Sequence, residues 1–116
     1  WLLGENISQP VQHRIAGSLK MVYIRSGEEY EVNPAAGLFI VSSGMVERYI
    51  RVDKKIRMGP GEFFNEENVL FESPIKFNVR AQQDTEFYVI KTSLIADVPV
   101  ARRKMFETFL LRMQAS

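Results

Sequence analysis

Polar side chains that could do chemistry gather in one stretch of the sequence, between residues 64 and 78. This stretch holds three carboxylates, three side-chain amides and one basic residue, namely Asn65, Glu66, Glu67, Asn68, Glu72, Lys76 and Asn78. Carboxylates accept hydrogen bonds and amides both donate and accept them, so this set suits the binding of a polar ligand. An anionic ligand would meet repulsion from the three carboxylates, because Lys76 is the only cation in the stretch.

The other reactive residues form no catalytic or metal-binding constellation. The sequence has no cysteine, which excludes a disulfide framework and a cysteine nucleophile and fits a reducing cytoplasm. Its one histidine is His13, whereas a metal-dependent cupin would need two or more histidines with a carboxylate. Ser42 and Ser43 have no histidine partner for a hydrolytic triad. We therefore predict no enzyme activity, no catalytic residues and no metal site.

Length and composition describe one ordinary domain. The 116 residues are 46% hydrophobic and 25% charged, which is enough for a single core. A net charge of +1 gives no global field that would attract nucleic acid or an anionic membrane. The longest apolar runs are far shorter than the roughly 20 residues that span a bilayer. We expect a cytoplasmic domain that neither inserts into a membrane nor binds nucleic acid directly.

Hydrophobic periodicity predicts helices at both ends of the chain and strands between them. Val11, Ile15 and Leu19 recur every four residues, which indicates an amphipathic helix over about residues 10–19. Short runs rich in β-branched and aromatic residues follow, separated by turn signals, and this spacing is typical of a sandwich or roll. The predicted strands are Met21 to Ile24, Glu29 to Val32, Leu38 to Ser42, Val46 to Val52, Lys54 to Met58, Lys76 to Ala81 and Glu86 to Ile90.

The period becomes helical again after Ile90. Ser93 is expected to cap a helical turn and Asp97 to cap the helix that follows it. Large apolar residues recur at helical spacing in that last helix: Met105, Phe106, Phe109, Leu110 and Met113. Such a stripe packs either on the core of its own domain or against a partner.

Taken in order, these signals resemble the cyclic nucleotide-binding domain family, which includes effector domains of catabolite activator-type regulators and kinase regulatory subunits. The residues that carry the resemblance are Lys20 to Glu28, Leu38 to Val46 and Met58 to Phe64. The resemblance implies a mainly β fold, an antiparallel β-roll or jelly roll (double-stranded β-helix) with a short N-terminal helix and C-terminal helices. A single domain would span residues 1–116, with its helix at about 10–19, its roll at about 20–91 and its C-terminal helices at about 93–115. Because the chain starts at Trp1 without a methionine or a signal pattern, we expect a fragment of a longer multidomain protein.

The resemblance also assigns the polar stretch to the family's phosphate-binding cassette. Glu66 stands where the family uses a glutamate to accept the ribose 2′-hydroxyl. The position after Pro74, where the family arginine pairs with the cyclic phosphate, is Ile75. Losing one charge-assisted partner costs about 1.5–3 kcal/mol, a roughly tenfold to hundredfold loss of affinity. Lys76 and Arg80 are the neighbouring cations that would have to compensate.

Two more positions of the cassette depart from the family pattern. Asn65 replaces a glycine; asparagine tolerates a left-handed backbone, but its side chain is expected to enter the approach to the phosphate. Asn78 stands at a threonine or serine position and still offers an amide donor. The candidate ligand-binding residues are Phe64, Asn65, Glu66, Glu67, Asn68, Ile75, Lys76 and Asn78.

Two functions remain open at this point. The first is a sensory or regulatory domain that binds a small ligand, for which cyclic AMP, cyclic GMP and other small anions or molecules are candidates. Such a domain passes its ligand state through the C-terminal helix to an output domain in the same full-length chain. The second is a domain that binds no ligand and serves homodimerisation or interdomain assembly through the same helix. No cofactor is required by either function.

Overall fold

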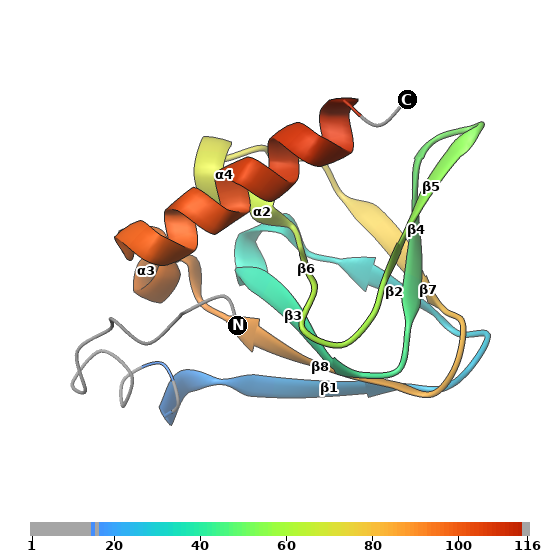
Figure 1. Ribbon diagram of the computed structural model, residues 1–116. Coiled ribbons are helices and arrows are strands. Elements are labelled where there is room, and N and C mark those ends of the chain that lie inside the picture. The colour runs from blue at the N-terminus through green and yellow to red at the C-terminus, as the bar shows by residue number, and fades with distance from the viewer. Residues whose placement is uncertain (1–14, 16, 115–116) are drawn as a thin grey trace.

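The strands form two four-stranded antiparallel sheets that face each other as a roll (Figure 1). The computed structural model describes residue 15 and residues 17–114. One sheet has the order β1 (Lys20–Ile24), β8 (Thr85–Ile90), β3 (Leu38–Ser43) and β6 (Phe63–Phe64). The other has the order β2 (Glu29–Val32), β7 (Phe77–Ala81), β4 (Val46–Arg51) and β5 (Lys54–Met58). The predicted antiparallel roll is confirmed.

Helices cover one side of the roll. The short helices are η1 (Pro34–Ala36), α2 (Glu66–Phe71) and α3 (Thr92–Ile95), and the long one is α4 (Pro99–Gln114). Figure 1 shows α4 crossing the molecule beside α2. The predicted cap at Ser93 is wrong, because α3 starts at Thr92 after Lys91 and has no side-chain cap. Most of the helix predicted over residues 10–19, with His13, lies outside the described residues.

Aromatic rings fill the space between the two sheets. Phe39 stacks on Phe64 with ring centroids 5.0 Å apart, and Phe87 packs against both rings. Tyr30 meets Phe39 and Phe87 edge to face from the second sheet. Edge-to-face and stacked contacts of this kind add to the free energy gained by burying the rings. These rings belong to the buried core between the two sheets.

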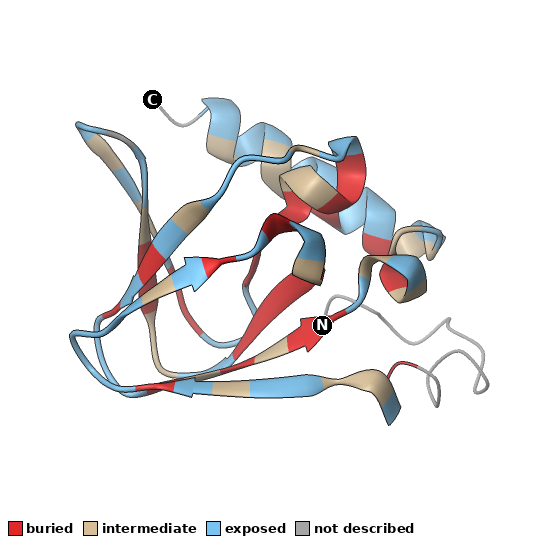
Figure 2. Cartoon of the chain, turned by 180° about the vertical axis from the view of Figure 1, so that it is seen from behind, coloured by how far each residue is buried: buried red, intermediate tan, exposed pale blue. Residues whose placement is uncertain are grey.

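A second core lies between the first sheet and the helices. Leu38, Ile40 and Ile90 point away from the aromatic cluster and pack against residues of the helices, namely Val69, Leu70, Ile95, Ala101 and Met105. Both faces of β3 are therefore covered, which explains why the four residues from Leu38 to Val41 are all buried (Figure 2). Burial of these apolar residues holds α2 and α4 against the first sheet.

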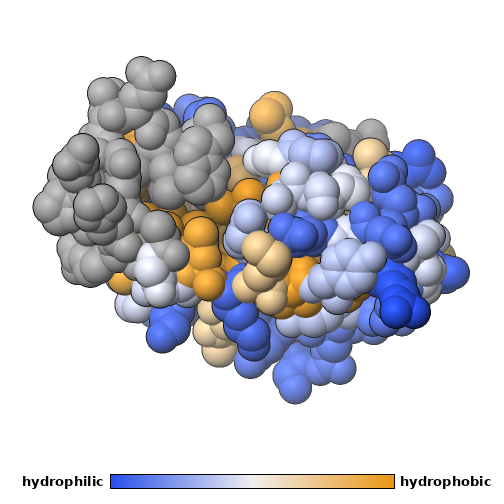
Figure 3. Space-filling model, turned by 90° about the horizontal axis from the view of Figure 1, so that it is seen from below, coloured by the Kyte–Doolittle hydropathy of each residue, from blue (hydrophilic) through white to orange (hydrophobic). Residues whose placement is uncertain are grey.

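Elsewhere the sheets are half exposed. The outward side chains of β7, Asn78 and Arg80, are exposed while Val79 and Ala81 are buried, as the alternation of side chains along a strand requires. Figure 3 shows the face below the molecule of Figure 1, where an apolar area lies beside larger hydrophilic areas. Strand β6 escaped prediction, because two residues are too few to display a period.

Candidate functional site

The turn before α2 is built on Asn65. Its backbone is left-handed, with a φ of 73°, so the expected tolerance of asparagine for this conformation is confirmed. Its buried side chain differs from the expectation, because it turns away from the cassette. The Nδ2 atom donates to the carbonyl oxygens of Pro34 at 3.1 Å and Gly37 at 2.7 Å. Asn65 thereby joins the start of α2 to η1.

Glu66 follows in the first turn of α2 and is held by Arg112 from the last turn of α4. The Nη1 atom of Arg112 donates to both carboxylate oxygens, at 2.8 and 2.7 Å. Its Nη2 atom donates to the carbonyl oxygen of Phe63 at 2.7 Å. Lys54 of β5 donates to the carbonyl oxygen of Arg112 at 3.0 Å. Three elements of the roll therefore hold the end of α4.

The Glu66–Arg112 pair is buried. The side chain of Glu66 is 1% exposed and that of Arg112 is 15% exposed. Burial raises the pKa of the Glu66 carboxyl above its ordinary value, and the positive charge of Arg112 opposes this rise. Because Glu66 already accepts two hydrogen bonds from Arg112, a ligand hydroxyl would have to compete with that guanidinium.

A second arginine enters the site from β4. The Nη1 atom of Arg48 donates to both carboxylate oxygens of Glu67, at 3.1 and 3.0 Å. Its guanidinium lies over the ring of Phe77, 3.5 Å from the centroid, which is the geometry of a cation–π contact. The buried Nε atom of Arg48 has no hydrogen-bond partner among the described residues. Each carboxylate in the first turn of α2 is therefore paired with an arginine.

These pairs line a cavity of about 180 Å³ between α2, the β4–β5 hairpin and α4. The rest of its wall is Ser73 and six apolar residues, namely Ile50, Ile56, Met58, Ile75, Phe109 and Met113. Small-molecule pockets usually measure roughly 300–1,000 Å³. With two cations facing two anions and a small volume, the cavity as it stands does not fit a cyclic nucleotide.

The structure brings together only part of the predicted set. Glu66, Glu67 and Ile75 line the cavity. Phe64 is buried in the aromatic core, and Asn68 donates to the carbonyl oxygen of Ser73 at 2.7 Å, closing the loop after α2.

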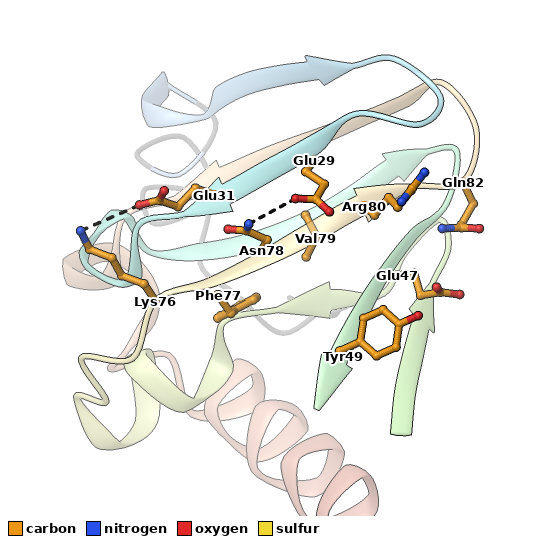
Figure 4. A pocket seen from close by; sticks show the side chains of 10 residues that line it. All are labelled: Glu29, Glu31, Glu47, Tyr49, Lys76, Phe77, Asn78, Val79, Arg80 and Gln82. Carbon is orange, nitrogen blue, oxygen red and sulfur yellow. Dashed lines mark hydrogen bonds and ion pairs between the residues drawn. The ribbon is translucent and has the colours of Figure 1, made fainter. Parts of the chain in front are cut away.

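Lys76 and Asn78 lie elsewhere, on the outer face of the second sheet (Figure 4). An open groove of about 810 Å³ runs over that face. Lys76 pairs with Glu31 at 3.9 Å and Asn78 donates to Glu29 at 3.4 Å. Arg80 lines this groove as well, so neither neighbouring cation of the cassette reaches the cavity.

The family model of the cyclic nucleotide-binding domain matches residues 30–98, which are more than half of the 116-residue chain. The chain belongs to the cyclic nucleotide-binding domain family. The matched region contains the cassette, including Glu66 and Glu67 of α2, which pair with the two arginines. A search of curated proteins finds no match.

Solved structures of low sequence identity share this family's fold. A protein described as a transcriptional regulator of the crp/fnr family from Eubacterium rectale is 17% identical, with a TM-score of 0.72 and coverage of 93% of this chain and 56% of that one. The regulatory domain of Toxoplasma gondii PKA with cAMP is 19% identical, with a TM-score of 0.69 and coverage of 94% and 46%. The Thermus thermophilus catabolite activator protein is 20% identical, with a TM-score of 0.65 and coverage of 97% and 58%. The chain thus spans about half the length of these proteins.

Within this cyclic nucleotide-binding domain, sequence reasoning missed both arginines of the cavity. Arg48 lies between Val46 and Ile50 in the alternation of β4, which places a charge on the inward face of a strand and could have identified it. Arg112 lies three residues after Phe109, on the same face of the last helix. Neither signal says which acid each arginine meets.

Two further properties concern the described residues only. No helix among residues 15 and 17–114 is long and apolar enough to cross a membrane. No group of three or more histidine, cysteine or acidic side chains in the same part of the chain could hold a metal ion.

Proposed function

We propose that this cyclic nucleotide-binding-like regulatory domain signals the presence of its ligand through the position of α4. In the docked state of this scheme, α4 packs on the roll and Arg112 binds Glu66. The observation that supports this most is the set of hydrogen bonds that Arg112 donates to the carboxylate of Glu66 and to the carbonyl oxygen of Phe63. Glu66 belongs to the cassette and Arg112 to the helix that would carry the signal. One pair of residues thus links the ligand site to the output.

Ligand binding and docking of α4 should exclude each other at Glu66. A ligand hydroxyl that uses this carboxylate must displace Nη1 of Arg112, and the cavity must widen from about 180 Å³. Displacing Arg112 frees the last turn of α4, because this residue also provides the contact with Phe63. A ligand acts in this scheme only by its higher affinity for the undocked state.

The proposed ligand is small; cyclic AMP, cyclic GMP and other small anions are the candidates, and the replacement of the phosphate-binding arginine by Ile75 argues against a standard cyclic nucleotide. Ile75 supplies no charge for a phosphate, and its side chain is 68% exposed. Of the sequence-derived candidates, Glu66, Glu67 and Ile75 are the residues that we propose contact the ligand. We further propose that the chain is one domain of a longer cytoplasmic protein, since a cysteine-free chain suits a reducing compartment.

Hydrogen exchange tests the link between Arg112 and α4. We expect Arg112→Ala to speed amide exchange over residues 99–114, with little change in β3 and β8. Arg103→Ala is the matched control, because this arginine is exposed on the same helix. Equal exchange in the two variants would overturn the role of Arg112 as the link.

Calorimetry tests the ligand. Cyclic AMP and cyclic GMP at millimolar concentration are titrated into the wild-type chain, Arg112→Ala, and Arg112→Ala with Ile75→Arg. We expect affinity to rise in that order, with a tenfold to hundredfold gain from the new arginine. If no variant binds either nucleotide, the ligand is not a cyclic nucleotide, whereas the exchange experiment still decides the role of α4.

Assembly is the second candidate function, and the outer face of α4 favours it. Met105 is buried and Phe109 packs on the core, but Leu110 and Leu111 are large and exposed. Adjacent exposed apolar residues are typical of an interaction surface. Sedimentation at several concentrations tests this function, with Leu111→Asp as the variant that should abolish self-association. A strict monomer at all concentrations would exclude homodimerisation of this chain.

A further inference from the structure

A shallow groove separates α2 from the first half of α4 and shares no lining residue with the cavity. Its volume is about 420 Å³, and it is lined by Leu70, Phe71, Pro99, Arg102, Arg103 and Phe106. The two phenylalanine rings meet edge to face, 6.3 Å apart. Phe71 is 51% exposed and Phe106 is 45% exposed. The groove therefore offers two aromatic faces to solvent.

Two consecutive arginines, Arg102 and Arg103, line the groove beside these rings, and Lys104 follows them in α4. Arg102, Arg103 and Lys104 are exposed in the first half of α4. None of them makes an ion pair with the residues that the structure describes, and Arg102 donates only to the carbonyl of Ala96, at 3.3 Å. The positive end of the helix dipole adds to their field. The groove is thus electropositive, although the chain as a whole carries a net charge of only +1.

We propose that this groove binds an acidic peptide segment of a partner protein. An aromatic or leucine side chain of the segment would lie on Phe71 and Phe106, and flanking carboxylates would pair with Arg102 and Arg103. Arginine suits this role because its planar guanidinium binds a carboxylate through two hydrogen bonds. Exposed aromatic and arginine side chains side by side are typical of the residues that contribute most to binding energy in protein interfaces.

A peptide fits this groove better than a nucleic acid or a membrane. Binding to nucleic acid rests on many phosphate contacts, and three neighbouring cations supply few. Stable membrane binding needs a larger apolar surface than two half-exposed rings. A groove between two helices, by contrast, matches the way that short amphipathic segments dock.

Selection from a random peptide library displayed on phage tests the proposal, with the 116-residue chain as bait. We expect enriched peptides to carry aspartate or glutamate on both sides of an aromatic or leucine residue. Arg103→Glu should weaken the best peptide about tenfold or more. Phe106→Ala should weaken it as well, and Arg80→Glu, which reverses an exposed cation on β7, should not. Unchanged thermal unfolding would show that the variants are folded.

Three outcomes would overturn the proposal. The first is the absence of enrichment or the enrichment of peptides without acidic residues. The second is equal binding by Arg103→Glu and Arg80→Glu, which would place the peptide elsewhere. The third is tighter binding of the same chain to phosphatidylserine vesicles or to a single-stranded oligonucleotide, with loss of peptide binding when either is added.

Discussion

Arg112 donates hydrogen bonds of 2.8 and 2.7 Å to Glu66, although 46 positions separate the two residues in the sequence. The carboxylate is almost fully buried, so removing the arginine would leave an unpaired charge in a poorly solvated place. The pair thus holds α4 on the roll. Arg112 also balances the charge of Glu66, the residue at the position where the family uses a glutamate.

Removal of Arg112 should be costly for stability. We expect Arg112→Ala to lower the free energy of unfolding by about 3 kcal/mol, because Glu66 then lacks its partner. The double variant with Glu66→Leu should recover much of this loss, since no charge remains buried. Urea denaturation of both variants and of Arg103→Ala measures these differences. Additive losses in the double variant would contradict the coupling.

The ionised carboxylate of Glu47 should stabilise the folded protein, and this stabilisation should disappear in acid. Its carboxylate accepts a 3.0 Å hydrogen bond from Arg57 and lies 3.7 Å from Lys55. The bond from Arg57 lowers the pKa of Glu47 below its ordinary value of 4.5. The resulting stabilisation is present above pH 4.5 and lost as the pH falls through the lowered pKa. Urea denaturation at a series of pH values should show a flatter acid limb for Glu47→Gln; limbs of equal slope would refute this.

Glu66 should show the opposite dependence. Burial raises the pKa of its carboxyl above 4.5, so the folded state holds this proton more tightly than the unfolded chain does. Its contribution is complete below pH 4.5 and is lost as the pH rises through the raised pKa. Relative to Glu66→Gln, the wild-type protein should therefore lose stability over that rise. Chemical denaturation on both sides of pH 4.5 measures this difference, and a wild-type gain over the same interval would reverse our sign.

Gly37 should tolerate no side chain. Its φ is 129°, and a Cβ atom would collide with the carbonyl group of Ile90 and lie 3.0 Å from Cα of Lys91. We expect Gly37→Ala to cost about 3 kcal/mol or more, from backbone strain together with the collision. Gly61→Ala is the control, since its φ of 85° is also positive but no atom lies within 4 Å. It should cost only about 1–2 kcal/mol in thermal unfolding, and equal costs would show that the collision relaxes.

Asn65 should matter for its side chain as well as for its backbone. Asn65→Gly keeps the left-handed turn but leaves the carbonyl oxygens of Pro34 and Gly37 without their donor. We expect a loss of about 1–3 kcal/mol, the usual cost of unpaired buried polar groups. Asn78→Ala, which removes one exposed 3.4 Å contact, should change stability by less than about 0.5 kcal/mol. A neutral Asn65→Gly would mean that the turn alone is needed.

Local sequence patterns predicted the strands well, and the site less completely. The β-branched and aromatic runs and the turn signals between them depend on neighbouring residues, so they could be interpreted before the fold was known. Partners such as Arg48 for Glu67, or Arg112 for Glu66, belong to elements far apart in the chain. Strand β6 was missed for another reason, because two residues show no period.

The sequence by itself determined the antiparallel roll, the family resemblance and the replacement of the phosphate-binding arginine by Ile75. Only the tertiary structure decided that Arg112 binds the carboxylate of Glu66, that the side chain of Asn65 turns toward η1, and that Lys76 lies on the outer face of the second sheet. The physical reason is that strand and turn preferences act over a few residues, whereas charge pairing depends on which side chains the packed core brings within hydrogen-bond distance.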